Sequence, residues 1–272
     1  MTFTAPIIDP VMIKIGFISV KWYGMAYSVG LFLGYLYIKR IIKLYKLNFS
    51  TIHIDNFFTW AVLSIVFGGR LAYVIFYDPL KYVQNPLEIL KIHEGGMSFH
   101  GGMFIVCIAI YFFCKKHSLE WKTLSDLLSI SAPIVILLGR IANFINQELY
   151  GRKTDIPWGV IFPYLDNHAR HPSQIYEAIL EGIFLFFFIR WSVGKYETLR
   201  YKGLTSGLFY VGYGCTRIFS EFFREPDVQI GFLIKYCTMG QILSSPLLIA
   251  GSILIWQSFK LVEENKSILS KP

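Results

Sequence analysis

Long apolar stretches dominate this chain and restrict what it can fold into. A helix needs about 20 apolar residues to cross the hydrocarbon core of a bilayer. Of the 272 residues, 54% are hydrophobic and only 16% are charged, so several stretches approach that length with almost no charge. The sequence therefore predicts an all-α integral membrane protein with about seven transmembrane helices: residues 22–38, 57–77, 97–113, 124–144, 175–191, 204–223 and 241–259.

The distribution of Lys and Arg predicts how these spans are oriented. Thirteen of these residues lie in four short segments: 39–56, 114–123, 192–203 and 260–272. Nine lie in the longer segments on the other side: 1–21, 78–96, 145–174 and 224–240. Because Lys and Arg concentrate in short cytoplasmic loops, the amino terminus is predicted outside and the carboxyl terminus in the cytoplasm. We expect one transmembrane domain over residues 1–272, with a small outer loop region at about 145–174.

The net charge of +8 does not require a nucleic acid partner. A basic inner rim that faces anionic membrane lipid accounts for most of it.

The four cysteines lack the spacing of metal ligands, and no Asp and His constellation accompanies them, so neither a metal nor a cofactor is predicted. The first 21 residues lack the pattern of a cleaved signal peptide.

Polar side chains interrupt the apolar stretches at one depth. Under the predicted topology, six helices bring them to the outer half of the bilayer: Tyr23, Arg70, His100, the segment 140–148, the segment 171–177, and Arg217 with Glu221 and Arg224. An ionisable side chain in hydrocarbon costs roughly 2.5 to 3.5 kcal/mol on insertion scales. Such a concentration indicates a functional site.

Helical spacing groups these residues into two stripes. If the helix of the fourth span continues, one stripe contains Arg140, Asn143, Gln147 and Gly151, with Glu148 beside it. The sixth span carries the other, at spacings of three and four residues: Tyr213, Arg217, Glu221 and Arg224. Both stripes must face protein or water, because lipid does not satisfy them.

Structural roles remain open for the charged members. Arg217 and Glu221 could neutralise each other within one helix, and Arg224 could extend to the headgroups. Either Glu177 or Glu181 could pair with an arginine of another helix for purely structural reasons.

The second and third spans leave comparable alternatives. Arg70, with Tyr73 and Tyr77, could anchor its helix at the interface. His100 could be a packing histidine, and the neighbouring glycines, Gly101 and Gly102, permit close approach of either a helix or a ligand.

The residue types indicate an anionic ligand. Arginine presents a planar fork of donors that matches phosphate oxygens, and in a low-dielectric site it stabilises charge that develops on a phosphate leaving group. Lysine is absent from both stripes, and neither a Ser-His-Asp arrangement nor a phosphate-binding P-loop is visible. The pattern favours an anionic lipid headgroup that is reached from the outer leaflet.

Six ordered blocks carry a resemblance to a known family. They are residues 22–24, 68–70, 95–102, 139–152, 170–177 and 217–227. Together they resemble bacterial prolipoprotein diacylglyceryl transferase. The resemblance implies a multi-pass enzyme of the bacterial inner membrane, with its active site toward the outer leaflet. Such an enzyme moves the diacylglyceryl group of phosphatidylglycerol to the lipobox cysteine of a prolipoprotein signal peptide, which gives a thioether and releases glycerol 1-phosphate.

The resemblance also implies roles for individual residues. Arg140 corresponds to the arginine that binds phosphatidylglycerol and Arg217 to a second essential arginine. Further matching positions are Tyr23, His100, Asn143 and Gly151, with Glu148 and Glu221 in supporting roles. From the residues themselves we add as substrate-binding candidates Tyr213, Arg224, Arg70, Gly101 and Gly102. The chain departs from the family pattern at Ile105 and Gln147, where many relatives have glycine.

Two questions stay open at this point. His100 could be the general base for the substrate thiol, or it could orient the lipid while Arg140 and Arg217 lower the thiol pKa. The alternative function is a transporter or binding protein for an anionic organophosphate or lipid headgroup, and within enzymes a different phospholipid headgroup transferase. The absence of recognisable internal repeats weighs against a transporter.

Overall fold

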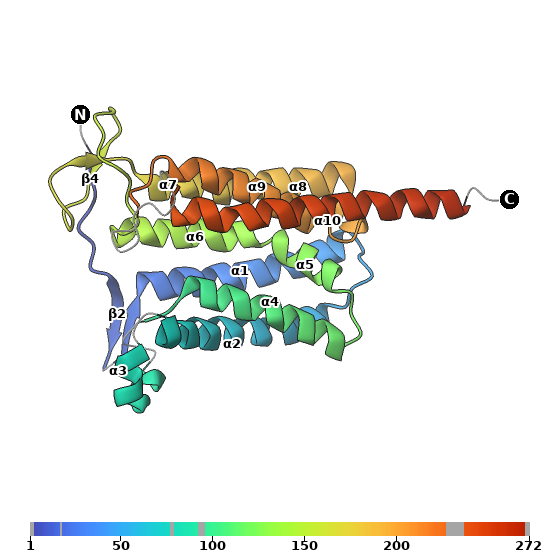
Figure 1. Cartoon of the computed structure of the whole chain (residues 1–272), viewed down its shortest axis with the longest axis horizontal. Coiled ribbons are helices and arrows are strands. Elements are labelled where there is room, and N and C mark those ends of the chain that lie inside the picture. The colour runs from blue at the N-terminus through green and yellow to red at the C-terminus, as the bar shows by residue number, and fades with distance from the viewer. Residues whose placement is uncertain (1–2, 17, 77–78, 92–95, 227–236, 270–272) are drawn as a thin grey trace. The chain divides into compact units, whose positions relative to one another are not determined.

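The structure is a computed structural model that describes residues 3–16, 18–76, 79–91, 96–226 and 237–269 (Figure 1). Most of the described chain is helical, as the composition predicts. The chain divides into two compact units, which consist of Met1–Leu36 with Asp126–Pro272 and of Tyr37–Ser125. We call them the first and the second unit. Helix α1 (Trp22–Leu44) runs from the first into the second.

The second unit is built on a close helix pair. Helices α2 (Thr51–Phe76) and α4 (Phe99–Lys116) lie side by side, and α3 (Pro79–Gln84) and the 3₁₀ helix η1 (Pro86–Leu90) lie between them in the sequence. A side chain at Gly101 would collide with Ala72, and a Cβ atom at Gly68 would lie 2.6 Å from the Cβ atom of Ile105. Of the two roles left open for Gly101, the structure shows helix packing. Gly68 makes the room that Ile105 needs.

The first unit contains five further α-helices of the described chain. They are α6 (Ala132–Ile145), α7 (Ser173–Glu177), α8 (Leu185–Tyr196), α9 (Leu204–Glu221) and α10 (Met239–Leu269). Between α7 and α8 the chain forms a π-helix, η3 (Ala178–Phe184), so these three elements make one continuous helix. The short 3₁₀ helix η4 (Thr198–Arg200) precedes α9. Figure 1 shows α6, α8, α9 and α10 side by side.

The fourth predicted span is not one straight helix. It consists of α5 (Trp121–Ser129) and α6, which are bent by 43°. Pro133 lies in the first turn of α6, where its missing N–H costs nothing but where it prevents a continuous helix through the preceding turn. The prediction of a single helix over 124–144 was therefore wrong in this detail.

Membrane-length helices are present in the described residues. By length and composition three helical stretches are able to cross a membrane, Trp22–Leu44, Thr51–Phe76 and Met239–Leu261, and the bent pair α5 and α6 makes a fourth if it is one span. The prediction of a helical membrane protein is thus confirmed. The count of seven spans and the orientation of the termini stay predictions.

Short strands cover one end of the first unit, a feature that the sequence analysis did not predict. Strand β1 (Phe3–Thr4) pairs in parallel with β4 (Val160–Ile161), which pairs antiparallel with β5 (Ala169–Arg170). Strands β2 (Val11–Ile15) and β3 (Ile18–Lys21) form a separate antiparallel hairpin before α1.

A small apolar core holds the three-stranded sheet against the end of α6. Ala5, Val160 and Phe162 are buried, and Phe144 and Tyr150 pack against them. The amino-terminal segment is thereby fastened to the predicted outer loop region, and the chain that follows α6 is held in place.

Candidate active site

A cluster of arginine and glutamate side chains lies where α6, the α7 and η3 helix, and α9 approach one another. Its members are Arg140, Glu177, Glu181, Arg217, Glu221 and Arg224. The side chains of Glu177 and Glu181 are fully buried, whereas that of Arg140 keeps 14% of its surface exposed. The cluster is therefore desolvated, and Arg140 is its most accessible cation.

Glu177 is the centre of this cluster. Its Oε2 atom lies 2.8 Å from Nη1 of Arg140, and its Oε1 atom accepts a hydrogen bond from Nη1 of Arg217. Nη1 of Arg224 lies 3.7 Å from the same Oε1 atom. One buried carboxylate thus contacts guanidinium groups that come from two other segments of the chain.

Glu181, one helical turn further, contacts Arg140 in a different way. Nε and Nη2 of Arg140 both donate to the single atom Oε2 of Glu181, at 3.2 and 3.0 Å. The other oxygen, Oε1, lies 3.9 Å from Nη1 of Arg217. The sequence left open whether one of these two glutamates pairs with an arginine of another helix, and the structure shows that both do.

Glycines bring the helices close enough for these ion pairs. A Cβ atom at Gly182 would lie 2.7 Å from the Cβ atom of Leu137, so η3 and α6 are in close contact one turn before Arg140. On the other side, Gly139 lies against the Tyr27 hydroxyl, which a Cβ atom there would approach to 2.9 Å. Larger residues at these glycines would push Arg140 away from its partners.

Helix α9 carries three members of the second predicted stripe, Tyr213, Arg217 and Glu221, whereas Arg224 lies three residues beyond its end, so the prediction was wrong for Arg224. Arg217 and Glu221 form the expected pair within the helix, and Glu221 also accepts a hydrogen bond of 2.6 Å from the Thr238 hydroxyl. Tyr213 lies one turn earlier, with its ring centroid 6.0 Å from that of Phe209. The alternatives for Arg217 were a pair within the helix and a role at the site, and it contacts both Glu221 of its own helix and Glu177 of another helix.

The first predicted stripe is interrupted, because α6 ends at Ile145. Gln147 has a φ of 55° and Leu149 a φ of 57°, in the left-handed region where glycine is favoured. This explains why glycine suits position 147. Asn143 and Glu148 nevertheless meet, with 2.7 Å between Nδ2 and Oε1.

Gln147 compensates for its backbone conformation through its side chain. Its Nε2 atom donates to the carbonyl of Pro6, and its Oε1 atom accepts from the backbone N–H of Tyr164, at 3.1 and 2.9 Å. The turn after α6 is thereby joined to both the amino-terminal segment and the outer loop region.

Gly151 connects the outer loop region to the end of α9. It forms an isolated antiparallel bridge with Arg224, and its N–H donates to the carbonyl of His171 over 2.9 Å. A Cβ atom at this position would collide with that carbonyl and would lie 2.6 Å from the carbonyl oxygen of Phe223. Only glycine fits here.

Sequence reasoning missed a second arginine centre just outside the helices. Arg170 is buried and donates to Asp166, to the carbonyl of Gly151 and to Glu225, at 2.7, 3.2 and 3.3 Å. The hydrogen bond from Arg170 lowers the pKa of Asp166 to about 2. Burial, followed by the charge of Arg152, lowers the pKa of the adjacent His171. The acidic and basic residues within 166–170 were the sequence signal that could have identified this centre.

Tyr23 lies at the start of α1 in the first unit. It is exposed, and its hydroxyl is 3.4 Å from that of Tyr27, which lies where a Cβ atom at Gly139 would approach it to 2.9 Å. Tyr23 is therefore linked through Tyr27 to the turn that carries Arg140, and its role at the site stays a prediction.

The remaining predicted residues belong to the second unit. Arg70 is buried and donates to the carbonyls of Glu88, Ile89 and Gly96, at 2.6, 2.9 and 3.1 Å, so it holds the segment between α3 and α4. Gly102 faces the carbonyl of Ile65 on α2. Substrate binding by Arg70, Gly101 and Gly102 stays a prediction.

His100 occupies the first turn of α4, and its side chain lies outside the described part of the structure. The side chain of Ser98 caps this turn by accepting from the N–H of Gly101 over 3.3 Å. Both roles of His100 therefore stay open.

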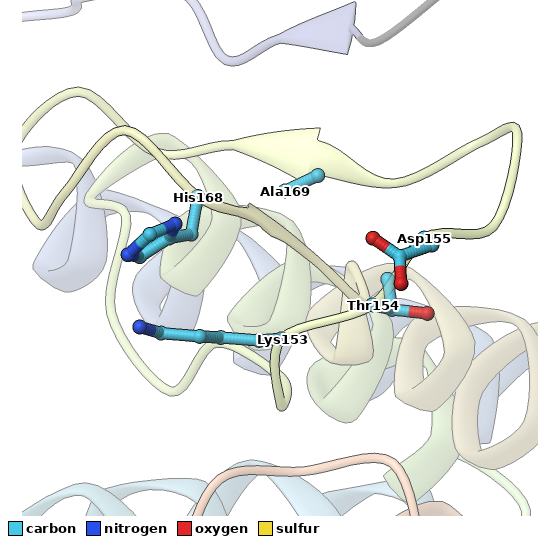
Figure 2. Close-up of a pocket in the computed structure, with 5 residues that line it drawn as sticks. All are labelled: Lys153, Thr154, Asp155, His168 and Ala169. Atoms are coloured by element: carbon cyan, nitrogen blue, oxygen red, sulfur yellow. The ribbon is translucent and has the colours of Figure 1, made fainter.

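A polar pocket of about 250 Å³ lies in the outer loop region (Figure 2). Lys153 and His168 extend along one side of it, and Thr154 and Asp155 lie on the other, with Ala169 above them. It contains none of the predicted site residues. The ion-pair cluster is the stronger candidate, because it brings together Arg140, Arg217, Glu221 and Arg224 from two separate predicted stripes.

Comparison with known proteins identifies the family of this chain. A family model described as prolipoprotein diacylglyceryl transferase matches residues 10–257. The chain belongs to this family. A phosphatidylglycerol–prolipoprotein diacylglyceryl transferase of Rickettsia typhi is 49% identical over 250 residues, which cover 92% of this chain and 96% of the relative. The transferases of Rickettsia felis and Rickettsia bellii are each 49% identical, over 95% and 94% of this chain and over 99% and 96% of the relative. The resemblance noted in the sequence is thus confirmed for the prolipoprotein diacylglyceryl transferase family over nearly the whole chain.

Proposed function

We propose that this protein transfers the diacylglyceryl group of phosphatidylglycerol to the thiol of the lipobox cysteine in a prolipoprotein signal peptide. Membership of the family and the names of the relatives support this function. The structural observation that carries it is the junction of Arg140 and Arg217 on one buried carboxylate, Glu177. This junction places two guanidinium groups from α6 and α9 within reach of one anion.

The reaction requires charge stabilisation on a phosphate. The cysteine sulfur attacks the carbon of the diacylglyceryl group that carries the phosphate. A carbon–sulfur bond forms there, and the carbon–oxygen bond breaks with its electron pair on the phosphate oxygen, which leaves as part of glycerol 1-phosphate. The thiol proton must pass to a base. Arginines that hold the phosphate stabilise the charge of the leaving group as it develops, and one such donor is typically worth about 10²- to 10³-fold in rate. Arg140 and Arg217 fit that role.

The other residues have supporting roles. Asn143, Glu148 and Gly151 hold the chain that follows α6, and Glu221 pairs with both Arg217 and Arg224. Tyr213 and Tyr23 flank the cluster from α9 and α1. His100 either accepts the thiol proton or orients the lipid. A free thiol has a pKa of about 8.5, so a base or a positive field is needed at neutral pH.

We place the protein in the bacterial inner membrane as a multi-pass protein with seven spans. The short segments rich in Lys and Arg support a cytoplasmic carboxyl terminus and an outer amino terminus. Under this orientation the cluster faces the outer leaflet, and the strands β1, β4 and β5 lie outside. We assign residues 1–272 to a single catalytic domain, because the family model extends over 248 of them, residues 10–257.

A reconstituted reaction tests the function. Purified protein is incubated with phosphatidylglycerol and a lipobox peptide, and the peptide is analysed by mass spectrometry. We expect a mass increase equal to one diacylglyceryl group and release of glycerol 1-phosphate, whereas a peptide with serine in place of the cysteine gains nothing. Lipid binding without product would contradict the proposal and would favour the alternative of a lipid-binding protein.

A further inference from the structure

The two buried glutamates hold Arg140 by different edges of its guanidinium group. Oε2 of Glu177 lies 2.8 Å from Nη1 of Arg140, and Oε1 of Glu177 accepts a hydrogen bond from Arg217. Glu181 contacts the edge of Arg140 that Nε and Nη2 form, but both of these groups donate to its Oε2 atom alone. Oε1 of Glu181 and Oε2 of Glu177 both lack a hydrogen-bond partner among the residues that the structure describes, but Oε2 of Glu177 is 2.8 Å from Arg140, whereas Oε1 of Glu181 is 3.9 Å from Arg217.

The contact between Glu181 and Arg140 therefore uses less of the donor geometry of the guanidinium group than a carboxylate can. The Nε and Nη2 edge of an arginine matches two oxygens of a carboxylate or phosphate, in two parallel hydrogen bonds. Here one oxygen receives both bonds, and a buried carboxylate oxygen without a partner is unfavourable. A phosphodiester, with two non-bridging oxygens, satisfies the same edge better.

We propose that Glu181 is a competing anion built into the site: it occupies the phosphate-binding edge of Arg140 in the free protein, and the lipid headgroup displaces it. This inference rests on the proposed function. The displaced carboxylate has a partner close by, because its Oε1 atom already lies 3.9 Å from Nη1 of Arg217. A small rotation of the Glu181 side chain is enough to exchange one arginine for the other.

Glu177 has the opposite role in this scheme. It contacts Arg140 and Arg217 at once, so it stays in place and fixes the distance between the two guanidinium groups when the phosphate binds. The two glutamates are one turn apart and equally buried, yet their removal should have opposite effects on headgroup affinity. Glu177 is a positioning residue, and Glu181 is a competitor that weakens binding of substrate and of phosphate product alike.

The test compares Glu181→Gln and Glu177→Gln with Glu197→Gln as the matched control. Glutamine keeps the volume of the side chain and removes its charge. Glu197 lies at the end of α8 and pairs with Arg200, and half of its side chain is exposed. Purified full-length variants are assayed for transfer to a lipobox peptide over a range of phosphatidylglycerol mole fractions, and for inhibition by glycerol 1-phosphate.

We expect Glu181→Gln to lower both the apparent KM for phosphatidylglycerol and the inhibition constant of glycerol 1-phosphate by roughly three- to tenfold, the size of a modest charge interaction. Glu177→Gln should raise both constants or reduce kcat, and the control should change neither. An unchanged or raised KM and inhibition constant in Glu181→Gln would overturn the inference, because a merely structural glutamate gives that result.

A second variant covers a failure of Glu181→Gln to fold. Glu181→Asp keeps the charge but withdraws it from Arg140 by one methylene, so both constants should fall there too, and unchanged constants would count against the inference. Binding of glycerol 1-phosphate is also measured directly by calorimetry. Tighter binding by Glu181→Gln in the absence of any transfer by the wild type would refute the proposed function while supporting the inference.

Discussion

Asn143 donates a hydrogen bond to the Glu148 carboxylate, with 2.7 Å between Nδ2 and Oε1. This contact ties the last turn of α6 to the turn beyond it, and so it fixes the end of the helix that carries Arg140. A charge change at either residue therefore tests whether this end of α6 must be rigid.

Asn143→Asp should reduce transfer at least tenfold. The new carboxylate faces that of Glu148 at hydrogen-bond distance, and two like charges in a partly buried site repel. In the double variant Asn143→Asp with Glu148→Gln, position 148 carries the donor and position 143 the acceptor. The hydrogen bond is thus restored in the opposite direction, and most of the activity should return. The measurement is the initial rate of peptide lipidation. No recovery in the double variant would show that Asn143 or Glu148 does more than pair with the other residue.

Arg140→Ala should abolish transfer while the protein is still produced and inserted. The loss leaves the lipid phosphate without its main cation, and we expect a decrease of about 10²- to 10³-fold or more. Arg140→Lys should rescue poorly, because a point charge lacks the planar fork that contacts Glu177 and the phosphate. Rates of both variants are compared with immunoblots of membrane fractions. Turnover near that of the wild type in Arg140→Ala would remove this residue from the site.

Asp166→Asn should make stability less dependent on pH in the acidic range. Arg170 lowers the pKa of Asp166 to about 2, so the ion pair stabilises the folded protein at neutral pH, and its contribution is lost as the pH falls from about 4 toward 2. The variant should melt at a lower temperature than the wild type at pH 7, and the difference should shrink below about pH 4. Thermal unfolding of detergent-solubilised protein measures this, with Asp155→Asn as the control. A difference that is constant with pH would mean that the pair contributes no charge-dependent stability.

His100→Gln distinguishes the two roles of that histidine. As a general base, His100 contributes roughly 10²- to 10⁴-fold, and the variant should recover activity toward alkaline pH as the substrate thiol ionises unaided. As an orienting residue, its loss should be modest and the pH profile should keep its shape. Rates from pH 6 to 9.5 separate these outcomes. A large loss with an unchanged profile would contradict both roles.

The orientation of the spans is tested by accessibility. Single cysteines are placed at Ser50, Asn85, His168 and Lys195 in a background without the four natural cysteines. A thiol reagent that cannot cross the membrane should label positions 85 and 168 on intact cells and leave positions 50 and 195 unlabelled until the cells are opened. The opposite pattern would invert the topology and remove the argument for an outer-leaflet site.

The helical spacing of residues predicted contacts within one helix but few of the contacts between helices. The apolar runs located the helices, and the spacing of Arg217 and Glu221 predicted their pair, because both signals come from a single segment. The partners of Arg140 were not identifiable individually, since Glu177 and Glu181 lie about 40 residues further along the chain and only packing through Gly182 brings them near.

The outer segments were the hardest part to predict. Strand β1 is two residues long and pairs with β4 more than 150 residues away, which leaves no local pattern to detect. The end of α6 was predicted to within one residue, since the fourth span was placed at 124–144, but the helix does not continue to Gly151, because Gln147 adopts a left-handed conformation that its residue type does not favour. That conformation depends on hydrogen bonds to Pro6 and Tyr164, which are long-range contacts.

The π-helix of η3 sets the phase between the two halves of one long helix. An α-helix advances by about 100° per residue, and a wide turn of this kind adds a residue without adding height. Glu177 at the end of α7 and Glu181 within η3 can thus face the arginines, while the direction in which the apolar α8 points is set separately. Deleting one residue between Ala178 and Phe184 would rotate α8 relative to α7 by about 100°. The length of this short segment therefore decides which face of α8 lies on the same side of the helix as Glu177.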